Sequence, residues 1–273
     1  MQTIGDPTII NPSHISNTDR RRLTEERIRT NTAIEDPNEM SDDYYETLIR
    51  LLLKTAESEL SLAFARHQWL FKASLIEQKF ILSDILRGHL RVANTIFKLT
   101  KSIGFDASSY TSRYHFYPDP GFGNSQFENP PESGIEDRIL LPYQPVSTWL
   151  ELSMSLFCIT RAVSIKMENT ISSSFGPWKR ECRVFLYERK KDLIIAESWI
   201  KNFVFNKSMK KETELMLEKW FTAAVNEFVR EDEGFAENQK RLGLGKKSIQ
   251  ELKRDFQNEM RTKCSELGLH IPE

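Results

Sequence analysis

Residues 41–70 have the sequence SDDYYETLIRLLLKTAESELSLAFARHQWL, and this stretch has the pattern of a long helix. Ser41 is a suitable N-cap, and Asp42 and Asp43 follow it where a helix presents its positive end. Apolar residues then recur every three or four positions, which predicts a helix of about 25 residues. The predicted buried line consists of Tyr45, Leu48, Leu52, Ala56, Glu59 and Ala63. Glu59 thus places one carboxylate in an apolar stripe, and its charge requires a partner.

Two further stretches have the same kind of pattern. A second helix is predicted from about 74 to 104, with Gly104 at its C-terminal end. Its predicted buried face consists of Leu82, Leu86, His89, Val92 and Ile96. A third helix is predicted within residues 146–170, and it stops near a run of serines at 172–174. Its predicted buried line consists of Trp149, Leu152, Leu156, Thr160, Val163 and Met167. Thr160 is the only polar core position expected in this helix.

The pair Gly176-Pro177 is predicted to open a fourth long helix, with Pro177 at its first position and its end near Phe203. One side of this helix consists of Phe185, Arg189, Asp192, Ala196 and Trp199, so two charged residues are expected to face inward. Residues 105–145 are rich in Gly, Pro, Ser and Tyr and have no sustained period, so we expect a crossover connection there.

Helices are also predicted at 210–229 and at 248–267, the second ended by Gly268, and no segment has a convincing strand pattern. Four long helices with one long crossover between the second and third predict an all-α, ferritin-like four-helix bundle with extra C-terminal helices. We expect residues 41–273 to form this helical domain. Residues 1–40 are polar and are interpreted as a solvated N-terminal arm with one short helix.

The composition excludes several classes of partner. The 273 residues include 38 Lys and Arg against 39 Asp and Glu, a formal net charge of −1. The sequence has no basic stripe with interleaved aromatic residues, so nucleic-acid binding is not expected. The chain has no window of 18 uncharged apolar residues and no apolar leader, so neither membrane spanning nor secretion is expected. Three scattered cysteines predict neither a disulfide framework nor a metal knuckle, and they favour the cytoplasm.

Four segments resemble one known family. They are TAIEDPNEMSDDYYETLIRLLLKTAESE at 32–59, YQPVSTW at 143–149, SFGPWKR at 174–180 and ELKRDFQNEMRTKCSELGLHIPE at 251–273. They resemble the catalytic A subunit of the phenylacetyl-CoA epoxidase complex, a bacterial multicomponent oxygenase of the ferritin-like di-iron class. The resemblance covers about residues 30–273 and implies the same bundle.

The resemblance also implies where metal ligands would stand. The family's di-iron site has a carboxylate on each of the first and third helices and a Glu-x-x-His pair on each of the second and fourth. Glu59 stands at the first-helix carboxylate. The other five ligand positions are occupied here by His89, Val92, Thr160, Arg189 and Asp192. One ligand of six is retained, so the resemblance implies a degenerate di-iron site.

The replacements oppose metal binding on chemical grounds. A di-iron site needs hard carboxylate oxygens and imidazoles, which Val92 and Thr160 cannot supply. The Arg189 guanidinium would add a fixed positive charge where two cations should lie. We therefore expect no metal cofactor. Our hypothesis is that Arg189 replaces the metals and pairs with Glu59, and also with Asp192, in a buried network.

Two functions compete on this basis. The first is a catalytically silent, structural or regulatory subunit that pairs with a homologous ferritin-like oxygenase subunit or with itself. The resemblance implies a precedent, because such oxygenases pair a di-iron subunit with a homologue that lacks the metals. Long apolar helix faces and the aromatic residues Trp69, Phe71 and Trp220 suit such an interface, although the same residues suit an ordinary core.

The second function is an oxygenase or other oxidoreductase with a remodelled site. Glu59, His89 and Asp192 would then hold a single iron or manganese ion, with Glu188 as a fourth ligand. Glu188 also fits a solvated helix face. Arg189 would bind an anionic group of an aromatic or acyl substrate such as a CoA ester. A third interpretation is a binding protein that keeps the former metal cavity for a small ligand.

Overall fold

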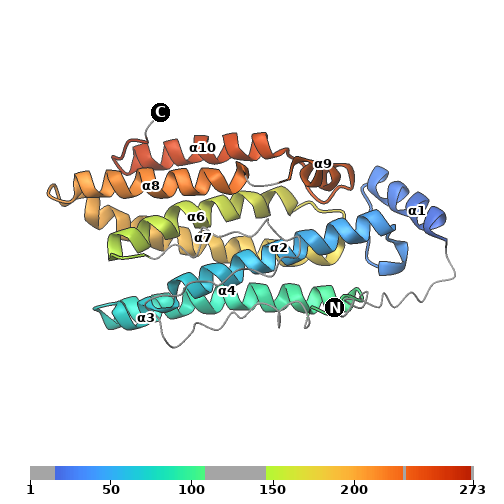
Figure 1. Cartoon of the computed structure of the whole chain (residues 1–273), viewed down its shortest axis with the longest axis horizontal. Coiled ribbons are helices and arrows are strands. Elements are labelled where there is room, and N and C mark those ends of the chain that lie inside the picture. Colours follow the sequence, from blue (N-terminus) through green and yellow to red (C-terminus); the bar gives the residue numbers. More distant parts are fainter. Residues whose placement is uncertain (1–15, 108–145, 230–231, 272–273) are drawn as a thin grey trace, which may run out of the picture.

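Four long helices form the core of the molecule, as Figure 1 shows. They are α2 (Asp42–His67), α4 (Ile76–Ser102), α6 (Trp149–Thr170) and α7 (Gly176–Val204). The computed structural model describes residues 16–107, 146–229 and 232–271. Within these ranges it contains no strand, only one isolated bridge between Ile34 and Phe175. The predicted all-α four-helix bundle is confirmed, whereas residues 108–145 of the predicted crossover lie outside the described residues.

The helices pack in pairs. Helix α2 packs along α4, and α6 packs along α7. Contacts between α4 and α7 join the two pairs. Helices α8 (Lys210–Val229) and α10 (Ile249–Glu266) add a further layer over α6 (Figure 1). The predicted extra C-terminal helices are therefore part of the folded domain.

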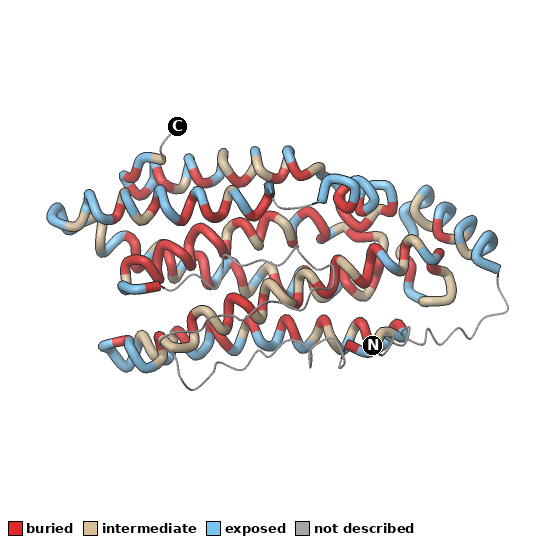
Figure 2. The backbone as a smooth tube through the Cα atoms, viewed as in Figure 1, coloured by how far each residue is buried: buried red, intermediate tan, exposed pale blue. Residues whose placement is uncertain are grey.

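This extra layer buries α6 on nearly all sides, as the red tube of Figure 2 shows. The prediction that Thr160 is its only polar core residue is wrong. Its other buried polar residues are Glu151, Ser153, Ser155, Ser164, Asn169 and Thr170. The serine hydroxyls donate to carbonyl oxygens of their own helix, for example Ser164 to the oxygen of Thr160 at 2.7 Å. Because these bonds are local, the hydroxyls can be buried without a partner from another helix.

The predicted helix ends lie close to the observed ones. Ser41 is the N-cap of α2, but its hydroxyl donates to Asp43 Oδ1 at 2.6 Å instead of accepting from the backbone. Pro177 is the second residue of α7 rather than the first. Gly104 and Gly268 follow α4 and α10 with φ of 91° and 73°, a left-handed conformation that favours glycine at a helix end.

The aromatic residues divide between the core and the surface. In α2 the buried tyrosine is Tyr44 rather than the predicted Tyr45, which is half-buried. The Tyr44 hydroxyl shares a 2.8 Å hydrogen bond with the hydroxyl of Ser174, at the turn before α7. Trp69, in the short helix α3 (Trp69–Lys72), is buried and so is Trp220, whereas Phe71 is 82% exposed. Of these three aromatic residues, only Phe71 is available at the surface.

The N-terminal segment contains the predicted short helix, α1 (Asn17–Arg29), and a 3-10 turn at η1 (Pro37–Glu39). The prediction of a solvated arm is wrong for its second half, because Ile34 and Met40 have no exposed surface. Ile34 donates to the oxygen of Ser174 at 2.7 Å and accepts from the amide of residue 176 at 3.0 Å. These backbone bonds attach the segment to the start of α7, which its polar composition did not indicate.

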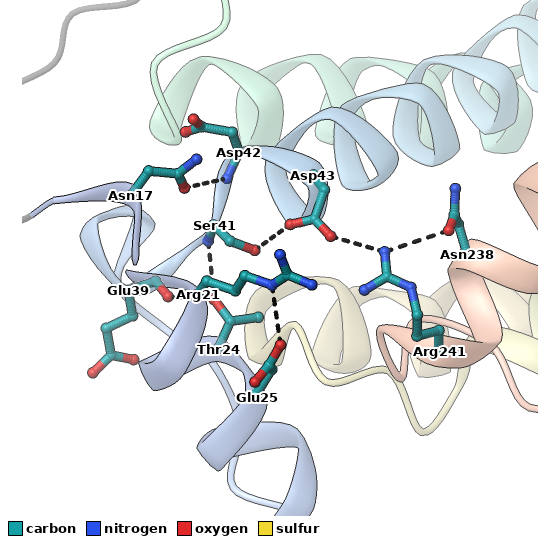
Figure 3. A network of polar contacts seen from close by, with 10 residues as sticks. All are labelled: Asn17, Arg21, Thr24, Glu25, Glu39, Ser41, Asp42, Asp43, Asn238 and Arg241. Atoms are coloured by element: carbon teal, nitrogen blue, oxygen red, sulfur yellow. Dashed lines mark hydrogen bonds and ion pairs between the residues drawn. The ribbon is translucent and has the colours of Figure 1, made fainter. Parts of the chain in front are cut away.

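Polar contacts attach the same region to α9 (Glu233–Arg241), a short helix that the sequence pattern did not predict (Figure 3). Arg241 pairs with Asp43 at 2.8 Å, and the Ser41 amide donates to the Thr24 hydroxyl at 2.9 Å. Together these contacts join α1, the start of α2 and α9 at one end of the bundle.

In the part of the chain that the structure describes, no helix is long and apolar enough to cross a membrane. Cys158, Cys182 and Cys264 are all buried and have free thiols.

Candidate functional site

Five buried polar side chains meet in the middle of the four-helix bundle. Glu59 and Arg66 come from α2, His89 from α4, and Arg189 and Asp192 from α7. Glu59, His89 and Arg189 have no exposed surface, and the other two are almost as deeply buried. Residues seven apart on α2 and three apart on α7 lie on the same side of their helices. The predicted inward-facing charges of both helices therefore come together.

The His89 ring lies between Glu59 and Arg66. Its Nδ1 is 2.7 Å from Glu59 Oε2, and its Nε2 is 2.9 Å from Arg66 Nη1. A guanidinium only donates, so Nε2 accepts from Arg66 and Nδ1 carries the hydrogen that is donated to Glu59. Burial lowers the pKa of His89 well below its ordinary value, and the charges of Arg189 and Arg66 lower it further. The imidazole is therefore neutral.

The Arg189 guanidinium lies at the centre of the cluster. Its Nη1 is 2.6 Å from His89 Nδ1 and 2.9 Å from Nε2, so the cation lies against the ring. The same nitrogen is 2.9 Å from Asp192 Oδ2 and 3.7 Å from Glu59 Oε2. The ion pairs that we hypothesised from the sequence are thus present with both carboxylates.

Burial and charge act in opposite directions on the ionisable groups. Burial raises the pKa of Glu59 and of Asp192, and the guanidinium groups of Arg189 and Arg66 lower both. The net result for Asp192 is a pKa of about 6. Burial lowers the pKa of Arg66 to about 10, so this residue stays charged at neutral pH. Two guanidinium groups and two carboxyl groups thus surround a neutral imidazole.

Val92 and Thr160 do not contribute to this network. They stand at two other positions where the family resemblance implies metal ligands. Val92 is fully buried and belongs to an apolar cluster with residues of α2 and α7. The Thr160 hydroxyl is buried without a hydrogen-bond partner among the described residues, as are Arg189 Nε and Nη2 and Glu59 Oε1. Each such buried polar atom costs on the order of 1–3 kcal/mol of folding free energy. The network is therefore incompletely hydrogen-bonded.

Glu188 lies outside this network. It is half-buried and forms an ion pair with Arg91 of α4. Gly88, on the next turn of α4, leaves room for α7, because a Cβ atom there would lie 3.3 Å from Arg189 Nη2 and 3.4 Å from Glu188 Oε2. To join Glu59, His89 and Asp192 as a metal ligand, Glu188 would have to leave Arg91.

The residues present do not fit a di-iron centre. Such a centre needs several carboxylates and imidazoles that converge on the metals. Among the residues that the structure describes, no three His, Cys, Asp or Glu side chains are placed to hold a metal ion. The Arg189 cation lies against His89 and Asp192 and within ion-pair distance of Glu59, so its charge opposes a second cation there.

Four long helices whose inner sides bring carboxylates and an imidazole together define a ferritin-like bundle. The sequence matches the family model described as phenylacetic acid catabolic protein over residues 13–273. The chain therefore belongs to this family, and the resemblance noted from its sequence is confirmed. A comparison with curated protein sequences found no match.

Arg66 is the member of the site that sequence reasoning missed. The predicted buried line of α2 ended at Ala63, and one more step of three residues reaches Arg66. The signal was therefore available in the periodicity. An arginine near a helix end usually extends into water, and only the position of His89 on α4 shows that this one turns inward.

Proposed function

We propose that this chain is a non-catalytic subunit of a ferritin-like oxygenase assembly, with a structural or regulatory role. In this proposal a buried charge network replaces the di-iron centre. The observation that carries it is the position of Arg189 Nη1, within 2.6 to 3.7 Å of His89, Asp192 and Glu59. The side chains best suited to bind metal are thus already occupied by a cation that belongs to the protein.

The network explains how such a bundle would be stable without metal. Buried carboxylates are costly unless they are paired and hydrogen-bonded. Here Arg189 and Arg66 provide two positive charges for Glu59 and Asp192, the same number of carboxylates. His89 links Glu59 to Arg66 through its two ring nitrogens. The helices are therefore held together by side chains in the place where metal ions hold them in an active subunit.

The metal content of the purified protein tests this proposal. The protein is expressed with iron and manganese supplied, and its metals are measured by elemental mass spectrometry. We expect iron and manganese well below one per chain in folded protein. A family member that keeps both Glu-x-x-His motifs, purified in parallel, is the control and should contain iron.

Near-stoichiometric iron or manganese would contradict the proposal. It would support the remodelled oxidoreductase, in which Glu59, His89 and Asp192 hold one metal ion and Glu188 joins them. That arrangement requires Arg189 to leave the cluster and bind an anionic substrate group. The variant His89→Ala would then lose the metal, and oxygen consumption with aromatic or acyl substrates would be the next measurement.

The proposal also requires a partner. The family resemblance implies association with a homologous ferritin-like subunit, and a second copy of this chain is the other candidate. Co-expression with the intact family member, followed by size-exclusion chromatography with light scattering, should give a stoichiometric complex. Two proteins that elute separately at micromolar concentration would count against a subunit role.

A further inference from the structure

Helices α4 and α7 expose a series of large apolar residues. Each of them is between 45% and 68% exposed. They are Ile76, Phe80 and Leu90 on α4, and Val184, Tyr187 and Ile194 on α7. The α7 residues are three and seven positions apart, which is the spacing of an apolar stripe that packs against another helix. Leaving such residues in water is costly, and contiguous apolar patches usually mark an interaction site.

The two stripes lie on neighbouring helices. The ion pair between Arg91 and Glu188 joins α4 to α7, and in the sequence these two residues directly follow Leu90 and Tyr187. The exposed residues of α4 follow its outer side in Figure 2. We call the surface formed by these six apolar residues the α4–α7 face.

The charges of these two helices differ from those of the chain as a whole. Helices α4 and α7 together contain twelve Lys and Arg residues and six Asp and Glu residues, whereas the whole chain has 38 and 39. The exposed basic residues are Arg87, Arg91, Lys98 and Lys101 on α4, and Arg180, Arg183, Lys190, Lys191 and Lys201 on α7. Exposed acidic residues on the same helices are Glu77 and Asp84, and Asp84 already pairs with Arg87. Arg91 and Arg180 are also paired, with Glu188 and Glu35. The positive charge that borders the apolar stripes therefore comes mainly from the exposed lysines and from Arg183.

We propose that the α4–α7 face is the docking surface for a helical partner chain whose apolar stripe is flanked by Asp and Glu side chains. The helical spacing of the exposed residues favours a helix as the docking element, and the basic border favours carboxylates around it. The choice of partner rests on the proposed function, so the probe is the family member that keeps both Glu-x-x-His motifs.

The test compares matched surface variants of the full chain. Ile194→Asp lies on the face, and Leu215→Asp is its control, because Leu215 is similarly exposed on α8. Lys190→Glu reverses a charge on the face, with Lys211→Glu on α8 as its control. Affinity for the intact family member is measured by biolayer interferometry after circular dichroism has shown that each variant is folded. We expect Ile194→Asp to weaken binding about 30-fold or more, as for a central interface residue, and Leu215→Asp to leave it unchanged.

The second pair of variants tests the role of the positive charges. Lys190→Glu should weaken binding and Lys211→Glu should not, and raising the salt from about 0.1 M to about 0.5 M should weaken the wild-type complex. Wild-type binding that neither Ile194→Asp nor Lys190→Glu reduces would overturn the face and leave the subunit role intact. Absence of wild-type binding would overturn both proposals.

Two other occupants of the face would give distinct results. Dimerisation of the isolated chain that Ile194→Asp abolishes would show that a second copy covers the face. Co-sedimentation with phosphatidylglycerol vesicles, but not with phosphatidylcholine vesicles, that Ile194→Asp abolishes would show a lipid surface. Either result would overturn the proposed protein partner.

Discussion

Replacing Arg189 with leucine removes the central cation of the buried network while keeping an apolar side chain in its place. Glu59 and Asp192 then lose an ion pair each, at 3.7 Å and 2.9 Å, and Arg66 remains as the only cation of the network. Removing one partner of a buried ion pair costs ~3–5 kcal/mol, because the remaining charge is left uncompensated. For a chain of this size each kcal/mol corresponds to ~2–4 °C, so the melting temperature should fall by about 6–20 °C.

The loss should depend on pH, and its sign follows from Asp192. The folded pKa of Asp192 is about 6, above its ordinary value of 3.8, so the folded state binds this proton more tightly than the unfolded state. Its contribution to stability therefore falls as the pH rises through about 6. Without the Arg189 charge this folded pKa rises further, and the fall extends to higher pH. The variant should thus lose less stability at pH 5.5 than at pH 8.

His89 also makes the stability loss of the Arg189→Leu variant smaller at pH 5.5 than at pH 8. Its pKa is held well below the ordinary value of 6.5, so in the wild-type protein it costs stability as the pH falls below 6.5. Removing Arg189 relieves part of that repulsion and lets the imidazole accept a proton at low pH. The difference between variant and wild type at each pH isolates these effects from the other titrating groups.

Thermal and urea denaturation at pH 5.5 and pH 8 provide the assay. Arg183→Leu is the matched control, because Arg183 is exposed on the same helix, and it should change stability by no more than about 0.5 kcal/mol. Arg189→Lys keeps a positive charge and should lose less than Arg189→Leu. A melting temperature for Arg189→Leu equal to that of wild type, or a loss that is larger at pH 5.5 than at pH 8, would refute the reasoning.

Three further variants examine Arg66 and Thr160. Arg66→Met removes the donor to His89 Nε2 and should cost roughly 1.5–3 kcal/mol in urea denaturation, the usual contribution of a charged hydrogen bond. In the double variant with Arg189→Leu the losses should be non-additive, and strict additivity would mean that the two guanidiniums act independently. Thr160→Val removes a buried hydroxyl that has no partner among the described residues, so it should raise stability by about 1 kcal/mol, and a clear loss would show that the hydroxyl is bonded.

The sequence alone determined the helices that build the bundle. In α2, α4, α6, α7, α8 and α10 the apolar residues recur at the helical period, and this local signal placed each helix within a few residues of its observed bounds. The same periodicity placed Glu59, His89 and Arg189 in the core, as the structure finds them. Side-chain direction along a helix is set by its geometry, so burial of these residues could be predicted without the tertiary structure.

The partners of those residues were decided by the tertiary structure. The orientation of Arg66 toward His89 depends on how α2 lies against α4, and the burial of α6 on nearly all sides depends on the layer that α8 and α10 add. The attachment of Ile34 to Ser174 likewise joins residues 140 positions apart. A periodic pattern describes one helix at a time, whereas a buried charge is stabilised by groups from several helices, and their relative positions are set only when the helices pack.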